Sequence, residues 1–156
     1  MNDINDFSGR YNFLSNFYPV SVYILIGKKW VRCATVEHAF QASKTLSQHQ
    51  RRRIVDATSP SMAKHIGRHV IRASYWEDVK TVIMLELLRQ KFSRSDLIDR
   101  LLRTQDAQLI EGNNWHDNFW GVCACGNGIG SDGQCNGGLN WLGKLLMRVR
   151  KDLQRG

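Results

Sequence analysis

The chain has 156 residues, close to the usual size of one domain, and 42% of them are hydrophobic, which is enough to bury a core. It holds no apolar run of about 18 or more residues, which excludes a membrane-spanning helix within this sequence. The net charge of +8 favours an anionic partner, such as a phosphorylated small molecule, a nucleotide or a nucleic acid.

The N-terminal segment predicts a small β portion. Phe7–Tyr11, Val22–Ile26 and Trp30–Cys33 are rich in β-branched and aromatic residues, as strands are. Gly27-Lys28 separates the last two and predicts a hairpin turn. The first residues, M-N-D-I-N-D-F, lack the basic and apolar regions of a signal peptide, so we expect a cytoplasmic protein without disulfides.

Asn12–Pro19, N-F-L-S-N-F-Y-P, predicts a loop that combines amides with aromatic rings. Asn16 and Phe17 are candidate substrate-binding residues at the rim of a pocket. The same composition also suits a loop whose rings fill the core, and both interpretations stay open.

Thr35–Lys44, T-V-E-H-A-F-Q-A-S-K, opens an amphipathic helix that we expect to start at the N-cap Thr35 and run through Leu46. Glu37, Gln41 and Lys44 share one helical stripe. At 1.5 Å per residue, Glu37 and Lys44 lie roughly 10 Å apart along the axis, too far for an ordinary ion pair. The stripe is either a solvated face or the wall of an active site that touches a nucleoside-sized ligand.

The middle of the chain predicts helices, and their expected ranges are Gln48–Ala57, Ser59–Gly67, Trp76–Phe92 and Ser95–Leu102. Basic side chains accumulate between residues 48 and 72, with a single acid, Asp56, among them; they are Arg51, Arg52, Arg53, Lys64, Arg68 and Arg72. This basic segment is either a solvated face or a strip that binds phosphate.

The last third begins with Gln108–Glu111, a predicted short strand, and ends with a predicted helix over Asn140–Leu153. Between them, E-G-N-N-W-H-D-N-F-W concentrates aromatic rings, amides and acids. Trp115, Asp117 and Trp120 in this segment are candidates for stacking a base and binding ribose hydroxyls. Core anchors and turn residues are the alternative for the same side chains.

The cysteines are Cys33, Cys123, Cys125 and Cys135, the last within a glycine-rich loop, Gly126–Gly138. Cys-x-Cys near His116 raises the question of zinc, but the spacing is not that of a standard finger or ribbon. We therefore expect structural thiols and no metal.

Taken together, these segments resemble the NADAR family, the YbiA-like N-glycosidases. The helix sequence matches the family's T-x-E-H-x-x-Q-x-x-K pattern, and F-L-S-N-F-Y-P at Phe13–Pro19 matches its N-terminal motif. Leu109–Cys123 resembles the W-x-D-x-x-W-G segment, and Gly138–Arg150 resembles the terminal G-x-N-x-L-G-x-L-L-M helix. The resemblance extends from about Phe7 to Lys151.

The resemblance implies a mainly α (α+β) fold, a single YbiA-like helical domain over residues 1–156 with a small N-terminal β portion. It implies a hydrolase, without cofactors, that cleaves N-glycosidic bonds of ribosyl compounds. The implied substrates are riboflavin-pathway phosphoribosylamino-pyrimidine intermediates or ADP-ribose on guanine bases of nucleic acid. It also implies Glu37 and Lys44 as catalytic residues, and as pocket residues Asn16, Trp115, Asp117 and Trp120.

Cleavage of a ribosyl–nitrogen bond builds positive charge at C1′ and negative charge on the leaving base. We expect Glu37 to act as acid and base, and Lys44 to act as a nucleophile or as an electrostatic clamp. A non-catalytic ADP-ribose or nucleotide-binding module would use the same pocket, and a nucleic-acid-binding domain would use the same basic segment. The sequence does not fix the oligomeric state.

Overall fold

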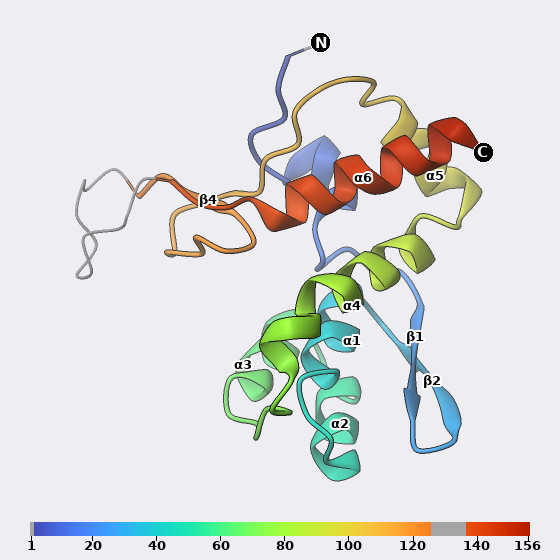
Figure 1. The fold of residues 1–156 in the computed structure, drawn as a ribbon, viewed down its shortest axis with the longest axis vertical. Helices are drawn as coiled ribbons and strands as arrows, with labels where there is room; N and C mark the ends of the chain where they lie inside the picture. Colours follow the sequence, from blue (N-terminus) through green and yellow to red (C-terminus); the bar gives the residue numbers. More distant parts are fainter. Residues whose placement is uncertain (1, 126–136) are drawn as a thin grey trace. The chain divides into compact units, whose positions relative to one another are not determined.

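The computed structural model describes residues 2–125 and 137–156. The chain forms two compact units, Asn16–Arg94 and the combination of Met1–Ser15 with Ser95–Gly156 (Figure 1). Helices dominate both, as the sequence predicts, and β structure is limited to two small two-stranded sheets in the described residues. The single domain over residues 1–156 stays a prediction.

The unit Asn16–Arg94 begins with an antiparallel hairpin, β1 (Val22–Ile26) and β2 (Lys29–Cys33), joined by Gly27 and Lys28 as predicted. Gly27 has a φ of 62°, a left-handed conformation that glycine adopts without steric cost. Side chains of β1 alternate between buried and exposed, so one face of the hairpin covers the core of this unit.

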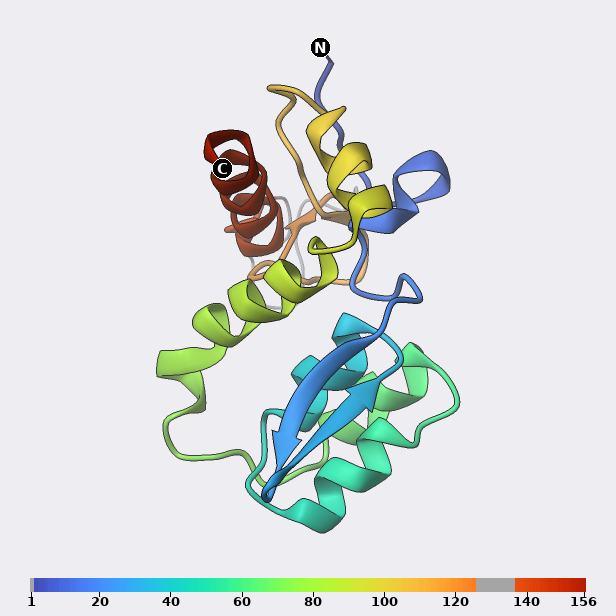
Figure 2. The same ribbon diagram turned by 90° about the vertical axis from the view of Figure 1, so that its right-hand side faces the viewer.

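Four helices follow in this unit: α1 (Val36–Ala42), α2 (Gln48–Val55), α3 (Pro60–Gly67) and α4 (Trp76–Lys91). The first of them, α1, packs against the other three and against the hairpin, which Figure 2 shows lying across the helices. Every residue of α1 is consequently buried. Thr35, Ser47 and Ser59 cap the first three helices by accepting hydrogen bonds from backbone N–H groups.

The other unit contains a 3₁₀ helix, η1 (Gly9–Leu14), and the helices α5 (Ser95–Leu102) and α6 (Trp141–Arg155), which pack together. Two short parallel strands, β3 (Gly112–Asn113) and β4 (Val122–Cys123), complete it.

Asn140 and Arg150 tie α6 to the chain that precedes β3. The Asn140 amide donates to the Leu109 carbonyl at 2.9 Å and accepts from the Glu111 N–H at 3.1 Å. The buried Arg150 guanidinium donates to the Thr104 hydroxyl at 2.7 Å.

Three expected elements differ from the structure. The predicted strand Phe7–Tyr11 is wrong, because the 3₁₀ helix starts within it at Gly9, where φ is 50°. The predicted strand Gln108–Glu111 is reduced to one bridge between Leu109 and Ile4. The helix expected to reach Leu46 ends at Ala42.

The early end of α1 has a tertiary cause. The Lys44 carbonyl accepts a hydrogen bond at 2.8 Å from the N–H of Ala73, a residue far along the chain. The Ser43 hydroxyl also bonds the Ala39 carbonyl at 2.7 Å. Leu46, expected on the inner face, is therefore 63% exposed.

The other helices lie within two residues of their expected bounds. Among residues 2–125 and 137–156, none of the helices combines the length and apolar character that crossing a bilayer requires.

Candidate functional site

Glu37 lies in the first turn of α1, where the N-terminal end of the helix favours a negative charge. Its side chain is only 6% exposed, and its Oε1 accepts a hydrogen bond at 2.7 Å from Nε2 of Gln41. Its backbone N–H donates to the Asn16 carbonyl at 3.1 Å. This burial excludes the solvated-face interpretation for Glu37 and Gln41.

Asn16 and Gln41, which both hydrogen-bond Glu37, each have a buried side-chain oxygen without a hydrogen-bond partner among the described residues: Oδ1 of Asn16 and Oε1 of Gln41. Buried polar atoms in proteins are nearly always hydrogen-bonded, since an unpaired one costs about 1–3 kcal/mol. Both oxygens are hydrogen-bond acceptors, and a sugar hydroxyl or an N–H group of a base could act as their donor. We therefore treat Asn16, Glu37 and Gln41 as a candidate ligand-binding site.

Gly67 in α3 makes room for Gln41. A β-carbon on Gly67 would lie 2.1 Å from Oε1 of Gln41, far inside van der Waals contact. Sequence reasoning missed this role, because Gly67 looked like a helix end and its partner is 26 residues away.

Lys44 lies two residues beyond α1 and is half-buried. Burial lowers its pKa below the ordinary value of 10.5; the nearby Glu37 carboxylate raises the pKa, and Arg72, Lys64 and Arg68 lower it further. A lysine with a lowered pKa is more often neutral and hence nucleophilic. Lys44 and Glu37 thus interact electrostatically without forming a surface ion pair.

His38 holds α1 in place, a role that the sequence did not reveal. Its Nε2 lies 3.0 Å from the Ala57 carbonyl, which can only accept, so Nε2 carries the proton. Its Nδ1 then accepts from the Thr35 hydroxyl at 2.8 Å. This buried chain of hydrogen bonds fixes the turn that carries Glu37.

The basic segment divides into two parts. Arg51 donates to the carbonyls of Thr45, at 2.6 Å, and Leu25, at 3.0 Å, so it supports the fold. Arg68 is exposed, and it acts electrostatically on Lys44 together with Lys64 and Arg72. The phosphate-binding hypothesis therefore fits these three residues better than Arg51.

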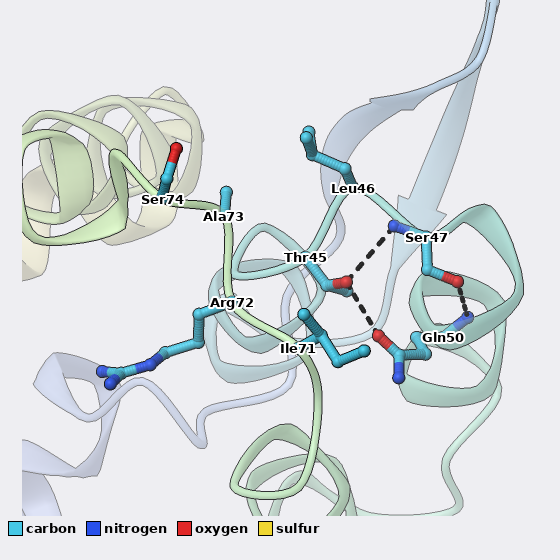
Figure 3. Close-up of a pocket in the computed structure, with 8 residues that line it drawn as sticks. All are labelled: Thr45, Leu46, Ser47, Gln50, Ile71, Arg72, Ala73 and Ser74. Carbon is cyan, nitrogen blue, oxygen red and sulfur yellow. Dashed lines mark hydrogen bonds between the residues drawn. The ribbon is translucent and has the colours of Figure 1, made fainter.

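A pocket of about 320 Å³ lies beside the segment that follows Lys44 in the chain. It is lined by Thr45, Leu46, Ser47, Gln50, Ile71, Arg72, Ala73 and Ser74 (Figure 3). Its polar groups largely bind one another: the Thr45 hydroxyl donates to Gln50 Oε1 at 2.8 Å and accepts from the Ser47 N–H at 3.2 Å. Arg72 points away from them (Figure 3). None of the predicted site residues lines this pocket, so it does not mark the chemical centre.

The predicted residues Asn16, Phe17, Glu37, Gln41 and Lys44 all belong to the unit Asn16–Arg94. Asn16 contacts Glu37 through its carbonyl, and Phe17 next to it is 37% exposed. Its ring therefore does not fill the core, which favours the rim interpretation for Phe17.

Trp115, Asp117 and Trp120 belong to the other unit. Asp117 Oδ1 accepts from the Trp120 N–H at 2.9 Å and from the Phe119 N–H at 3.3 Å, so this oxygen shapes the turn. The Trp120 ring meets the Phe119 ring edge to face at 4.9 Å, whereas Trp115 is 57% exposed. Trp115 is thus the best placed of the three to stack a ligand from solvent, and the role of Trp120 is at least partly structural.

His116, Cys123 and Cys125 could hold a metal ion. Their ligand atoms all lie within 4.8 Å of one another. Cys135 and most of the glycine-rich loop lie outside the described residues.

Comparisons with known proteins agree with the resemblance. A family model described as NADAR domain matches residues 5–154. N-glycosidase YbiA of Escherichia coli (strain K12) is 36% identical over 151 residues, covering 94% of this chain and 84% of that protein. N-glycosidase Npun_R5314 of Nostoc punctiforme is 37% identical over 150 residues, covering 92% of this chain and 86% of that protein.

Riboflavin biosynthesis protein VVA0006 of Vibrio vulnificus is 32% identical over 148 residues; these cover 93% of this chain but only 36% of that protein. The NMR structure of the Escherichia coli protein YbiA matches 99% of this chain and 84% of that chain, with a TM-score of 0.76 and 32% identity. The predicted YbiA-like, mainly helical α+β fold is confirmed.

Proposed function

Because the chain belongs to the NADAR domain family, we propose that it is an N-glycosidase that hydrolyses the bond between a ribosyl group and a base. Two relatives that cover most of the chain, YbiA and Npun_R5314, are named N-glycosidases. The observation that carries the proposal is the buried Glu37, hydrogen-bonded to Asn16 and Gln41, whose side-chain oxygens are buried without a hydrogen-bond partner among the described residues. A carboxylate kept from water beside two acceptors suits a sugar with several hydroxyl groups.

In the proposed reaction, Lys44 first passes its extra proton to the Glu37 carboxylate. The neutral Lys44 amine then attacks C1′ while the C1′–N bond breaks and Glu37 delivers that proton to the leaving base. The C1′–O4′ bond then breaks, O4′ takes a proton from the Lys44 nitrogen, and an imine with Lys44 forms. Water then adds to the imine with Glu37 taking up a proton, and the C–N bond breaks to give the free sugar and the amine. The lowered pKa of Lys44 supports its role as the nucleophile.

Lys44 as an electrostatic clamp is the alternative, and borohydride distinguishes the two. Reduction during turnover should attach the ribosyl group permanently to Lys44, which peptide mass spectrometry detects. Lys44→Arg keeps the positive charge but cannot form the imine. If Lys44→Arg retains turnover and no adduct forms in the native protein, Glu37 activates water directly and Lys44 is a clamp.

The substrate is proposed to carry phosphate, which Lys64, Arg68 and Arg72 would attract. Two sources share this chemistry: a free phosphoribosylamino-pyrimidine, in line with the name of the riboflavin biosynthesis relative, and ADP-ribose on guanine in nucleic acid. We test both in separate reactions and follow the released base and the ribosyl product by mass spectrometry. Release from one class and not from the other identifies the source.

Trp115, Asp117 and Trp120 stay proposed substrate-binding residues of the other unit. Trp115→Ala should raise KM with little change in the unfolding midpoint, because its ring is exposed. Trp120→Ala should lower stability as well, because its ring packs on Phe119.

A binding module without catalysis is the alternative function. It predicts that Glu37→Gln, which keeps the shape of the side chain, binds ligand as well as the native protein does and that neither releases a base. The N-glycosidase proposal predicts release by the native protein and loss of release in Glu37→Gln, with ligand binding retained.

A further inference from the structure

Cys123 ends β4 and Cys125 follows two residues later, and the proposed reaction does not use either thiol. The Cys123 N–H donates a hydrogen bond to the Gly137 carbonyl at 3.0 Å, and the Gly137 N–H donates one to the Cys123 carbonyl at 3.1 Å. On the other side, the Ala124 N–H donates to the Asn113 carbonyl at 2.8 Å. Residues two apart in extended chain point to the same side, so both thiols emerge on one face.

His116 comes from the loop between β3 and β4, and Asn113 fixes this loop. The Asn113 amide oxygen accepts from the N–H groups of Trp115, at 3.3 Å, and Asp117, at 3.1 Å. Its amide nitrogen donates to the Asp117 carbonyl at 2.8 Å. His116 lies within this turn and has a φ of 67°, a left-handed backbone conformation that residues other than glycine adopt only in a few per cent of cases.

Asn113 also connects this loop to the thiols, because it pairs with Cys123 in the parallel sheet of β3 and β4. A strained backbone is retained where the surrounding structure over-determines it, and such positions gather at functional sites. The result is that an imidazole and two thiols from separate segments are held on one scaffold, with their ligand atoms within 4.8 Å of one another.

We propose that His116, Cys123 and Cys125 form a zinc-binding site. Thiolate sulfur and imidazole nitrogen are the ligands that Zn²⁺ prefers. Bond lengths of about 2.0–2.3 Å place the ligand atoms of a tetrahedral zinc ion roughly 3.5–3.8 Å apart, so the three groups need to approach one another by about 1 Å or less on binding. The two thiols lose their protons to solvent as they bind, and a water molecule fills the fourth position.

The site is accessible to an incoming ion. His116 is exposed and Cys125 is half-buried, whereas Cys123 is buried and anchors the cluster. Zinc bound here would fix the loop from residue 113 to residue 125, which carries Trp115, Asp117 and Trp120. The proposal does not depend on the N-glycosidase activity.

The test uses the full chain without a polyhistidine tag. The protein is stripped with a chelator and titrated with Zn²⁺ by calorimetry, and elemental analysis after dialysis measures the bound zinc. We expect one equivalent per chain in the native protein. His116→Asn and Cys125→Ser should weaken binding by more than the about 10–100-fold that loss of an outer-shell partner costs. Asn tolerates the positive φ at position 116, so the backbone is kept.

Two control variants carry the same residue types elsewhere. Cys33 is fully buried in β2, and burial raises the pKa of its thiol to about 11, so Cys33→Ala should keep the full equivalent. His65 and His69 lie close, with ring centroids 5.2 Å apart, and are the alternative place where zinc could bind. If zinc binds at His116, Cys123 and Cys125, His69→Asn leaves binding unchanged; loss of the zinc equivalent in this variant overturns the proposal.

Cobalt gives a second, spectroscopic measurement that reports the ligand type directly. Co²⁺ bound to the native protein should show a thiolate-to-metal charge-transfer band that weakens in Cys125→Ser, while circular dichroism shows that the metal-free variants are folded. The proposal is wrong if the native protein binds no zinc at stoichiometric concentration. It is equally wrong if His116→Asn and Cys125→Ser bind like the native protein.

Discussion

Gly67 and Gln41 are complementary across two helices: a β-carbon on Gly67 would lie 2.1 Å from the amide oxygen of Gln41. That oxygen is buried and lacks a partner among the described residues, and the other end of the same amide donates to Glu37 at 2.7 Å. The glycine in α3 thus sets where Gln41 lies and, through Gln41, how the Glu37 carboxylate is oriented.

Gly67→Ala should therefore displace Gln41 and lower kcat/KM for the proposed reaction by about 10-fold or more, since small misplacements at a reacting centre are costly. Overpacking should also lower the free energy of unfolding by about 1–3 kcal/mol. Urea denaturation and steady-state kinetics measure both effects. Gln41→Ala removes the obstructing amide, so Gly67→Ala should cost less stability in that background; an equal cost in both backgrounds contradicts the contact.

Lys44→Met tests whether the buried charge opposes folding. Because the pKa of Lys44 is lowered, the folded protein binds fewer protons than the unfolded chain at pH values between the folded pKa and 10.5. The free energy of unfolding should therefore rise with pH across that window. Lys44→Met should lose activity yet be at least as stable as the native protein at neutral pH, and this advantage should shrink as the pH approaches 10.5.

Urea denaturation at a series of pH values measures the difference between Lys44→Met and the native protein. A variant that is less stable at neutral pH, or a difference that is independent of pH, would show that burial of Lys44 carries no electrostatic cost.

His38→Ala should destabilise the unit Asn16–Arg94 because it leaves the Ala57 carbonyl and the Thr35 hydroxyl without the imidazole. We expect a loss of about 1–3 kcal/mol, mainly from the Ala57 carbonyl, because the Thr35 hydroxyl still accepts from the backbone N–H of residue 38. His49, which is exposed at the start of α2, provides the matched control, and His49→Ala should change stability by less than about 0.5 kcal/mol. Equal effects at the two positions would mean that the His38 hydrogen bonds contribute nothing to folding.

Substitutions of Arg51 and Arg68 should have different effects, the first on stability and the second on substrate binding. Arg51→Ala removes hydrogen bonds to Thr45 and Leu25 and should lower stability with a small effect on KM. Arg68→Ala should leave stability nearly unchanged and raise KM, most strongly at low salt, where exposed charges are least screened. KM of both variants is measured at two ionic strengths, and their stability by urea denaturation. A larger effect on KM in Arg51→Ala and on stability in Arg68→Ala would contradict the division of the basic segment.

The bounds of α5 could be predicted to the residue and those of α3 to within one residue because their signals are local; Ser59 followed by Pro60 marks the start of α3 in two residues of sequence. The end of α1 could not, because the Lys44 carbonyl takes its partner from Ala73 instead of from the helix. Local preference favours a longer helix, and a tertiary hydrogen bond overrides it.

The candidate site also combines local signals with tertiary contacts. The helical spacing of Glu37, Gln41 and Lys44 makes them candidates. Whether Glu37 is buried or solvated depends on how the other helices cover α1, which the spacing does not show. The positions of Gly67 and His38 depend on contacts between segments about 20 or more residues apart. Spacing along the chain carries no information on such contacts.

The central claim is that Glu37 drives cleavage of a ribosyl–base bond. Its most direct test is the amount of free base and ribosyl product released by the native protein and by Glu37→Gln, measured by mass spectrometry on both substrate classes. We predict multiple turnovers by the native protein on at least one class and a rate about 10²–10⁴-fold lower in a folded Glu37→Gln variant. Equal rates for the two proteins, or no release by the native protein from either class, would contradict the claim.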